Sequence, residues 1–153
     1  MALIFRVRAD RCTGCGNCEM ACAFSHPAAG APGLSRITVI RRGDERGTPI
    51  LCLQCDEAAC VAACPSGALA RNAATGAIDL DPGRCITCRA CVGACPFGNM
   101  LWHEAAHQVA KCDLCGGRPQ CARFCPTGAI TYEPFDSRSA ASRPAGFLGP
   151  ATA

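Results

Sequence analysis

The sequence predicts a small α+β fold, in which short strands and single-turn helices surround a core that apolar side chains do not fill. The chain has 153 residues and 16 cysteines, but only one tryptophan, one tyrosine and six phenylalanines. The cysteines form four groups of four, here called quartets, and short strand-like segments separate them. In chain order, the quartets are Cys12, Cys15, Cys18 and Cys22; Cys52, Cys55, Cys60 and Cys64; Cys85, Cys88, Cys91 and Cys95; and Cys112, Cys115, Cys121 and Cys125.

The third quartet indicates what the cysteines bind. Residues 85–96, C-I-T-C-R-A-C-V-G-A-C-P, leave two, two and three residues between successive cysteines and end in proline. This is the ligand run of a bacterial-ferredoxin [4Fe–4S] site. The fourth cysteine comes one helical turn after the third and faces away from the first cluster, so it reaches a neighbouring one. A run of this kind needs a partner run.

Disulfides and zinc are the alternatives for so many cysteines. The first ten residues, M-A-L-I-F-R-V-R-A-D, have no signal-peptide h-region and are typical of a strand. We therefore expect a cytoplasmic location, not the oxidising one that a disulfide scaffold needs. Zinc sites use two C-x-x-C pairs per metal, whereas here three of the four quartets end in Cys-Pro. The sequence thus predicts four [4Fe–4S] clusters.

The charge balance argues for no particular macromolecular partner. The formal net charge is +3, but each oxidised cluster with four thiolates carries about −2, so the loaded protein would be near −5. We expect no nucleic-acid partner. The sequence has no run of about 18 apolar residues, so we expect no membrane span.

The segments between the quartets are expected to form short strands and loops. Residues 24–35 and 43–49 are rich in turn residues and are predicted to be loops. Glu19–Ala23 fits a single helical turn that carries Cys22. The predicted strands are residues 2–8, 37–42, 67–71, 77–81, 99–104, 107–111 and 127–133, of which the third and fourth form one hairpin and the fifth and sixth another. S-G-A-L-A after the second quartet and T-G-A-I-T-Y-E after the fourth indicate an internal repeat.

The quartets also resemble a known family. The second, C-L-Q-C-D-E-A-A-C-V-A-A-C-P-S-G-A-L, is similar to the signature of the four-cluster ferredoxin-like electron-transfer subunits of the dimethyl-sulfoxide-reductase iron–sulfur family. D-P-G-R-C-I-T-C-R-A-C-V-G-A-C-P-F-G, K-C-D-L-C and C-T-G-C-G-N-C-E-M-A-C agree with it, over residues 3–133. The resemblance implies two ferredoxin-like dicluster halves related by a pseudo-twofold axis. Thr87 and Ala59 depart from it, because glycine and proline are frequent there.

The resemblance also implies which cysteines share a cluster, because in that family the first quartet pairs with the fourth and the second with the third. The implied ligand sets are Cys12, Cys15, Cys18 and Cys125; Cys112, Cys115, Cys121 and Cys22; Cys52, Cys55, Cys60 and Cys95; and Cys85, Cys88, Cys91 and Cys64. One half would comprise residues 1–50 and 97–133, and the other residues 51–96. Residues 134–153 are expected to be a flexible or partner-binding tail.

The expected function is electron transfer without catalysis, because every iron can have a cysteine and none is left open for substrate. Subunits of the family connect molybdenum or tungsten pterin enzymes, hydrogenases or carbon monoxide dehydrogenases to another redox partner. The short chain favours a tungsten-dependent aldehyde oxidoreductase partner, with formate dehydrogenase and hydrogenase complexes open. A free polyferredoxin is the alternative, and a zinc or nucleic-acid module is a third. Further copies of the chain could stack into a longer wire.

Single residues near the quartets have competing interpretations. His26, His103 and His107 are predicted to be surface or loop histidines, because sixteen cysteines already supply every ligand. Lys111 either stabilises the charge of a reduced cluster or is solvated. Asp113 either orients the loop of the fourth quartet or faces water.

Overall fold

A computed structural model describes residues 3–27, 33–41, 43, 46–104 and 106–135. Its helices and strands are short, as expected for an α+β fold with little regular structure. Helices α2, α3 and α4 have four or five residues each, whereas α1 has nine and is longer than the predicted single turn. In chain order the elements are β1 (Leu3–Val7), η1 (Ala9–Arg11), α1 (Asn17–Ser25), β2 (Thr38–Arg41), β3 (Gly47–Ile50), α2 (Ala59–Ala62), β4 (Leu69–Arg71), β5 (Ile78–Leu80), α3 (Ala90–Ala94), β6 (Leu101–His103), β7 (Gln108–Ala110), α4 (Gln120–Arg123) and β8 (Ile130–Pro134).

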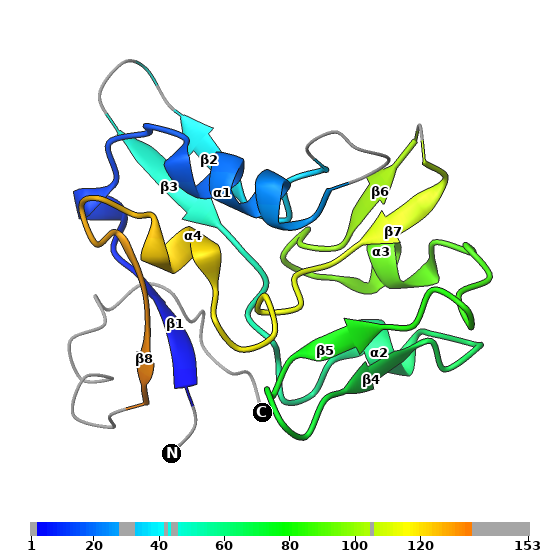
Figure 1. Cartoon of the computed structure of the whole chain (residues 1–153). Coiled ribbons are helices and arrows are strands. Elements are labelled where there is room, and N and C mark those ends of the chain that lie inside the picture. Colours follow the sequence, from blue (N-terminus) through cyan, green and yellow to red (C-terminus); the bar gives the residue numbers. More distant parts are fainter. Residues whose placement is uncertain (1–2, 28–32, 42, 44–45, 105, 136–153) are drawn as a thin grey trace, which may run out of the picture.

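The strands form four separate antiparallel pairs, β1 with β8, β2 with β3, β4 with β5, and β6 with β7. Figure 1 shows β1, β8, β2, β3, α1 and α4 on one side of the molecule, and β4 to β7 with α2 and α3 on the other. Two-stranded ribbons are only marginally stable by themselves in water. The stability of each pair therefore depends on what packs against it.

The β1–β8 pair joins the start of the described chain to the segment after the fourth quartet. Phe5 lies opposite Tyr132, with ring centroids 5.2 Å apart. Arg6 Nε lies 2.6 Å from Glu133 Oε1. An aromatic cross-strand pair contributes about 0.5–1.5 kcal/mol beyond its buried area. This pair holds the first and fourth quartets in one unit.

The strand β3 was not expected, because residues 43–49 were predicted to be a polar turn. Gly47–Ile50 instead pairs with β2, and Pro49 lies opposite Val39. A ribbon of two strands has two free edges, where a residue without an N–H is tolerated. Gly47 is needed, because an added Cβ would lie 2.5 Å from Val39 Cγ1 and 3.0 Å from Cys12 Sγ. The close approach brings β3 against the first quartet.

Two clusters of buried residues form the core, and cysteines are prominent in both. Ile78 and Ile130 are the largest fully buried side chains of the described residues. The first cluster contains Cys12, Cys18, Cys22, Ile37, Val39, Leu51, Cys121, Ala129 and Ile130. The second contains Leu69, Ile78, Cys91, Met100 and Val109, with Cys60, Cys64 and Cys95 packed against it. The first core therefore unites the first and fourth quartets, and the second core unites the second and third.

The hairpin β6–β7 packs with the second core, through Met100 and Val109. The predicted division placed residues 97–133 in the other half. We therefore propose that the second half continues through β7 and that the chain returns to the first half near Lys111. Pro134, the first residue of the predicted tail, ends β8, and residues 136–153 of that tail lie outside the described residues. None of the described helices has the length and apolar character that crossing a membrane would require.

Candidate metal centres

All four quartets place the residue before their second cysteine in left-handed backbone. The φ angle is +70° at Gly14, +51° at Gln54, +56° at Thr87 and +57° at Leu114. Glycine alone adopts this region without steric cost. Gln54, Thr87 and Leu114 adopt the same strained conformation at equivalent positions. The direction in which the cysteines must point therefore determines the shape of the loop.

Replacing Thr87 with glycine is expected to stabilise the third loop by about 1 kcal/mol. The left-handed conformation costs a residue with a Cβ about 1–2 kcal/mol, and the greater freedom of glycine in the unfolded chain offsets part of the gain. Slower loss of visible iron–sulfur absorbance in guanidinium, measured anaerobically, would show it. Thr13→Gly is the matched control, because Thr13 lies in the first loop with ordinary φ and should only lose stability. Faster loss in both variants would contradict the expectation.

The helices carry the remaining cysteines of each quartet. Helix α1 lies beside α4, and α2 lies beside α3 (Figure 1). The third cysteines lie on these helices and are Cys18, Cys60, Cys91 and Cys121. The fourth cysteine of the first quartet, Cys22, also lies within α1, whereas the other three follow their helix ends by one or two residues and are Cys64, Cys95 and Cys125. Because the helices are paired, each fourth cysteine lies next to the quartet of the other helix.

Two hollows in the structure are each lined by four cysteines. In both, three cysteines come from one quartet and the fourth comes from another. The first is lined by Cys12, Cys15, Cys18 and Cys125, together with Val39 and Pro49 of β2 and β3. The second is lined by Cys52, Cys55, Cys60 and Cys95, together with Leu53, Phe97 and Met100. These are two of the four ligand sets that the resemblance implies.

In the other two sets that the resemblance implies, the charges of the member thiols act on one another. Burial raises the pKa of Cys91, and negative charge on Cys64, Cys85 and Cys88 would raise it further. Burial also raises the pKa of Cys121, and charge on its three neighbours, Cys112, Cys22 and Cys115, adds to this. In each group the charge of a crossed fourth cysteine acts on the thiol of the other quartet.

The fourth cysteines accept hydrogen bonds from backbone N–H groups. Arg36 N lies 3.2 Å from Cys22 Sγ, and Ala68 N lies 3.3 Å from Cys64 Sγ. Asn99 N lies 3.4 Å from Cys95 Sγ. Hydrogen bonds from the hydroxyl of Ser66 and from the backbone N–H groups of Ala68, Leu69 and Ser66 lower the pKa of Cys64. Burial would raise the pKa of Cys22, but hydrogen bonds from His26 and Arg36 outweigh it. Thiolate is the form that binds metal.

Two other thiols, which lack enough compensating hydrogen bonds, hold their protons. Burial raises the pKa of Cys18 to about 11 and that of Cys112 to about 12. Only a cation that binds sulfur strongly can displace such protons at neutral pH. Four convergent thiols per group match the donor set of a [4Fe–4S] cluster, in which each iron takes one cysteine.

Lys111 provides an independent test of whether the sites fit an anionic group. Its side chain is only 4% exposed, so the solvated interpretation was wrong. Within the described part of the chain, no carboxylate forms an ion pair with it. A buried, uncompensated ammonium is costly. Its Nζ lies 3.5 Å from Cys52 Sγ, where a cluster with thiolate ligands would supply the missing negative charge.

His26 is one of the predicted surface or loop histidines; it lies in the loop directly after α1 but not at the surface. Its side chain is 12% exposed, and Nε2 lies 3.0 Å from Asp113 Oδ1. Asp113 also accepts from Arg36 at 2.8 Å and from the N–H of Cys115 at 2.9 Å. The hydrogen bond to Asp113 raises the pKa of His26 to about 10. Asp113 therefore orients the fourth loop, which was the first of its two interpretations. No local pattern in the sequence indicates its contact with His26.

Comparison with known proteins agrees with this geometry. Family models described as 4Fe-4S dicluster domains match residues 46–134 and 11–69. The aliphatic sulfonate oxidoreductase, polyferredoxin-like subunit of Pyrococcus furiosus is 40% identical over 76% of this chain and 67% of its own length. The putative electron transport protein YsaA of Escherichia coli is 40% identical over 80% of this chain and 83% of its own.

A third relative is much longer. The NADH-dependent phenylglyoxylate dehydrogenase subunit beta of Aromatoleum evansii is 37% identical over 80% of this chain, which spans only 28% of that subunit. The Pyrococcus and Aromatoleum relatives are named for different reactions, so their names point to no single substrate. With its α+β architecture and its cysteine quartets, the chain belongs to the 4Fe-4S dicluster family of ferredoxin-like electron-transfer proteins.

Proposed function

We propose that the chain is the electron-transfer subunit of an oxidoreductase complex and holds four [4Fe–4S] clusters. The observation that supports this best is that two hollows are each lined by four cysteines, three from one quartet and one from another. When bound, such clusters supply one-electron redox chemistry over a wide range of potentials. The proposed ligand sets are Cys12, Cys15, Cys18 and Cys125; Cys112, Cys115, Cys121 and Cys22; Cys52, Cys55, Cys60 and Cys95; and Cys85, Cys88, Cys91 and Cys64.

The residues of the chain would bind the clusters, orient them and exclude water. Cys88 and Cys15 are exposed, so the sets that contain them offer points where redox partners can approach. The other two sets meet at Lys111, which contacts both Cys52 and Cys112, two half-buried residues; these two sets are here called inner. The four groups thus have two outer members and two inner ones. This arrangement suits passage between two partners on opposite sides of the molecule.

For the catalytic partner we propose a tungsten- or molybdenum-pterin subunit, with a tungsten-dependent aldehyde oxidoreductase favoured. The Pyrococcus relative, named as the polyferredoxin-like subunit of an oxidoreductase, supports assembly with a catalytic subunit. A formate dehydrogenase or hydrogenase subunit and a free polyferredoxin are the competing proposals, and YsaA, named only as an electron transport protein, fits the free carrier equally. We also propose a cytoplasmic location, because cysteines that serve as cluster ligands suit a reducing compartment.

Two measurements test the proposal. Anaerobic purification of the native complex should yield about sixteen irons and as many acid-labile sulfides per chain. Zinc without sulfide would refute the clusters. A catalytic subunit that stays bound through size exclusion supports the complex, and a chain that elutes alone supports the free carrier. Light scattering of the complex decides whether further copies stack, since one copy per complex excludes a longer wire.

A further inference from the structure

Lys111 is chemically distinct among the cationic residues of the chain. Of fifteen lysines and arginines it is the only lysine, and it is buried. Arginine carries a planar fork of five donors, whereas lysine carries a compact charge with three donors. A chain that uses arginine everywhere else has therefore placed the smaller cation at its most enclosed basic position among the described residues.

Each proton of the Lys111 ammonium has an acceptor. Nζ lies 3.1 Å from Gln54 Oε1, 2.9 Å from the carbonyl oxygen of Cys112 and 3.5 Å from Cys52 Sγ. Three acceptors satisfy its three donors. The ammonium is therefore held in one position.

Gln54 orients this ammonium. Its Nε2 donates to the Cys112 carbonyl at 2.9 Å, and its Oε1 accepts from the N–H of Ile78 at 2.9 Å. These bonds settle which end of the amide is oxygen, and that oxygen faces Lys111. The left-handed backbone of Gln54 in the second loop presents the side chain in this direction. Gln54 therefore acts by holding the ammonium of Lys111 in place.

The contact joins the two halves of the molecule. Cys52 begins the second quartet and Cys112 begins the fourth, and the two quartets belong to different core clusters. The charge of Lys111 acts on both sides: burial raises the pKa of Cys60 and of Cys112, and Lys111 opposes that rise in each. One cation therefore faces two of the four ligand groups, and these are the two inner groups.

We propose that Lys111, held by Gln54, is a positioning residue that raises the reduction potentials of the two inner clusters above those of the outer two. This inference rests on the proposed function. A buried positive charge stabilises the added electron of a reduced cluster, and little solvent is present to screen it. An electron that enters from a reduced partner at either exposed end would be held at the centre until the other partner accepts it.

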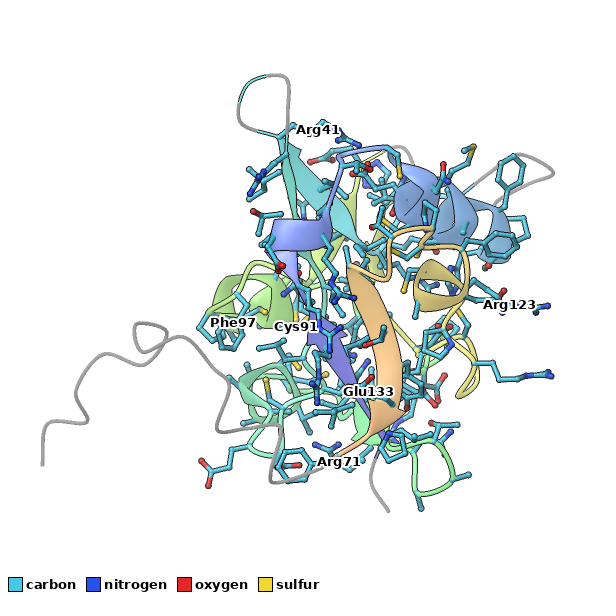
Figure 2. The ribbon with its side chains drawn as sticks, turned by 90° about the vertical axis from the view of Figure 1, so that its left-hand side faces the viewer. Arg41, Arg71, Cys91, Phe97, Arg123 and Glu133 are labelled. Carbon is cyan, nitrogen blue, oxygen red and sulfur yellow. The ribbon has the colours of Figure 1, made fainter. Side chains whose placement is uncertain are left out.

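The test is a redox titration of the anaerobically purified protein, followed by electron paramagnetic resonance. Lys111→Met removes the charge and keeps the length of the side chain, so two of the four transitions should move to lower potential while two stay. Gln54→Ala keeps the charge of Lys111 but frees the ammonium from its fixed position, so the potentials of the same two transitions should fall by a smaller amount. Arg123→Met is the matched control, because Arg123 lies between Cys121 and Cys125 but is exposed and projects outward (Figure 2). The Arg123→Met substitution should leave the potentials of all four transitions nearly unchanged.

The unaltered protein gives a second readout. Lysine labelled with ¹⁵N at Nζ introduces a single label, since Lys111 is the only lysine. Hyperfine coupling between that nitrogen and a reduced cluster is expected, and its absence would overturn the inference. Unchanged potentials in an iron-replete Lys111→Met protein, or equal shifts in all four transitions, would also overturn it. If Lys111→Met fails to take up iron, the labelled protein decides. Absence of iron and sulfide from the unaltered chain would instead refute the proposed function.

Discussion

Replacing Cys95 with alanine should damage the cluster of the second quartet and not that of its own quartet. Cys95 lines the same hollow as Cys52, Cys55 and Cys60. The variant should lose about one to four irons, as the affected cluster converts to a three-iron form or is lost. Electron paramagnetic resonance of the reduced protein measures which signal disappears. Cys95 belongs in sequence to the third quartet. The outcome therefore shows whether it binds the cluster of its own quartet or that of the second quartet.

Matched variants remove the need to assign signals in advance. Cys55→Ala should lose the same spectral component as Cys95→Ala, because both would change one set. Cys91→Ala and Cys64→Ala should share a different component, because Cys64 acts on Cys91 from the other quartet. If the spectrum of Cys95→Ala matched that of Cys91→Ala instead, the crossed ligand sets would be wrong.

Most of the correct predictions about the fold and the family followed from the spacing of the cysteines. Cysteine positions within a loop are local, and so are the turn at 72–76 between β4 and β5 and the short connection between β6 and β7. The expected strands accordingly appear as β1, β2 and β4 to β8. The α+β class and the ferredoxin-like family are confirmed, whereas the ligand sets and the count of four clusters stay predictions.

The features that sequence reasoning missed depend on contacts between distant residues. Gln54 and Lys111 are 57 positions apart, and His26 and Asp113 are 87 apart. No local pattern indicates such a pair. The strand β3 was missed for another reason, because Pro49 and Gly47 are typical of turns and only the pairing with β2 makes them part of a strand. The division into halves stays a prediction, and the packing of the hairpin β6–β7 with the second core, which led us to propose another boundary, depends on distant residues as well.

Removing iron should unfold the described part of the chain almost completely. The strand pairs have two strands each, too few to persist alone. The first core cluster has nine buried residues, of which four are cysteines. A domain of this size is stable by only about 5–15 kcal/mol, and the free energy of metal binding in such small domains is also their folding free energy. Chelation with mild oxidation, followed by hydrogen exchange of the backbone amides, measures the loss.

The same exchange experiment can distinguish a core that needs the clusters to stay folded from one that its apolar side chains stabilise without them. In the chelated protein, amides of β4 and β5 should exchange as fast as those of an unfolded chain, and iron with sulfide should restore their protection. Incubation with reductant but no chelator is the control and should change nothing. Cys95→Ala should lose protection chiefly in β4 to β7, while the β1–β8 pair stays protected, since Cys95 packs against the second core only. Slow exchange that persists in all strands of the iron-free chain would mean that residues such as Ile78 and Ile130 suffice as a core.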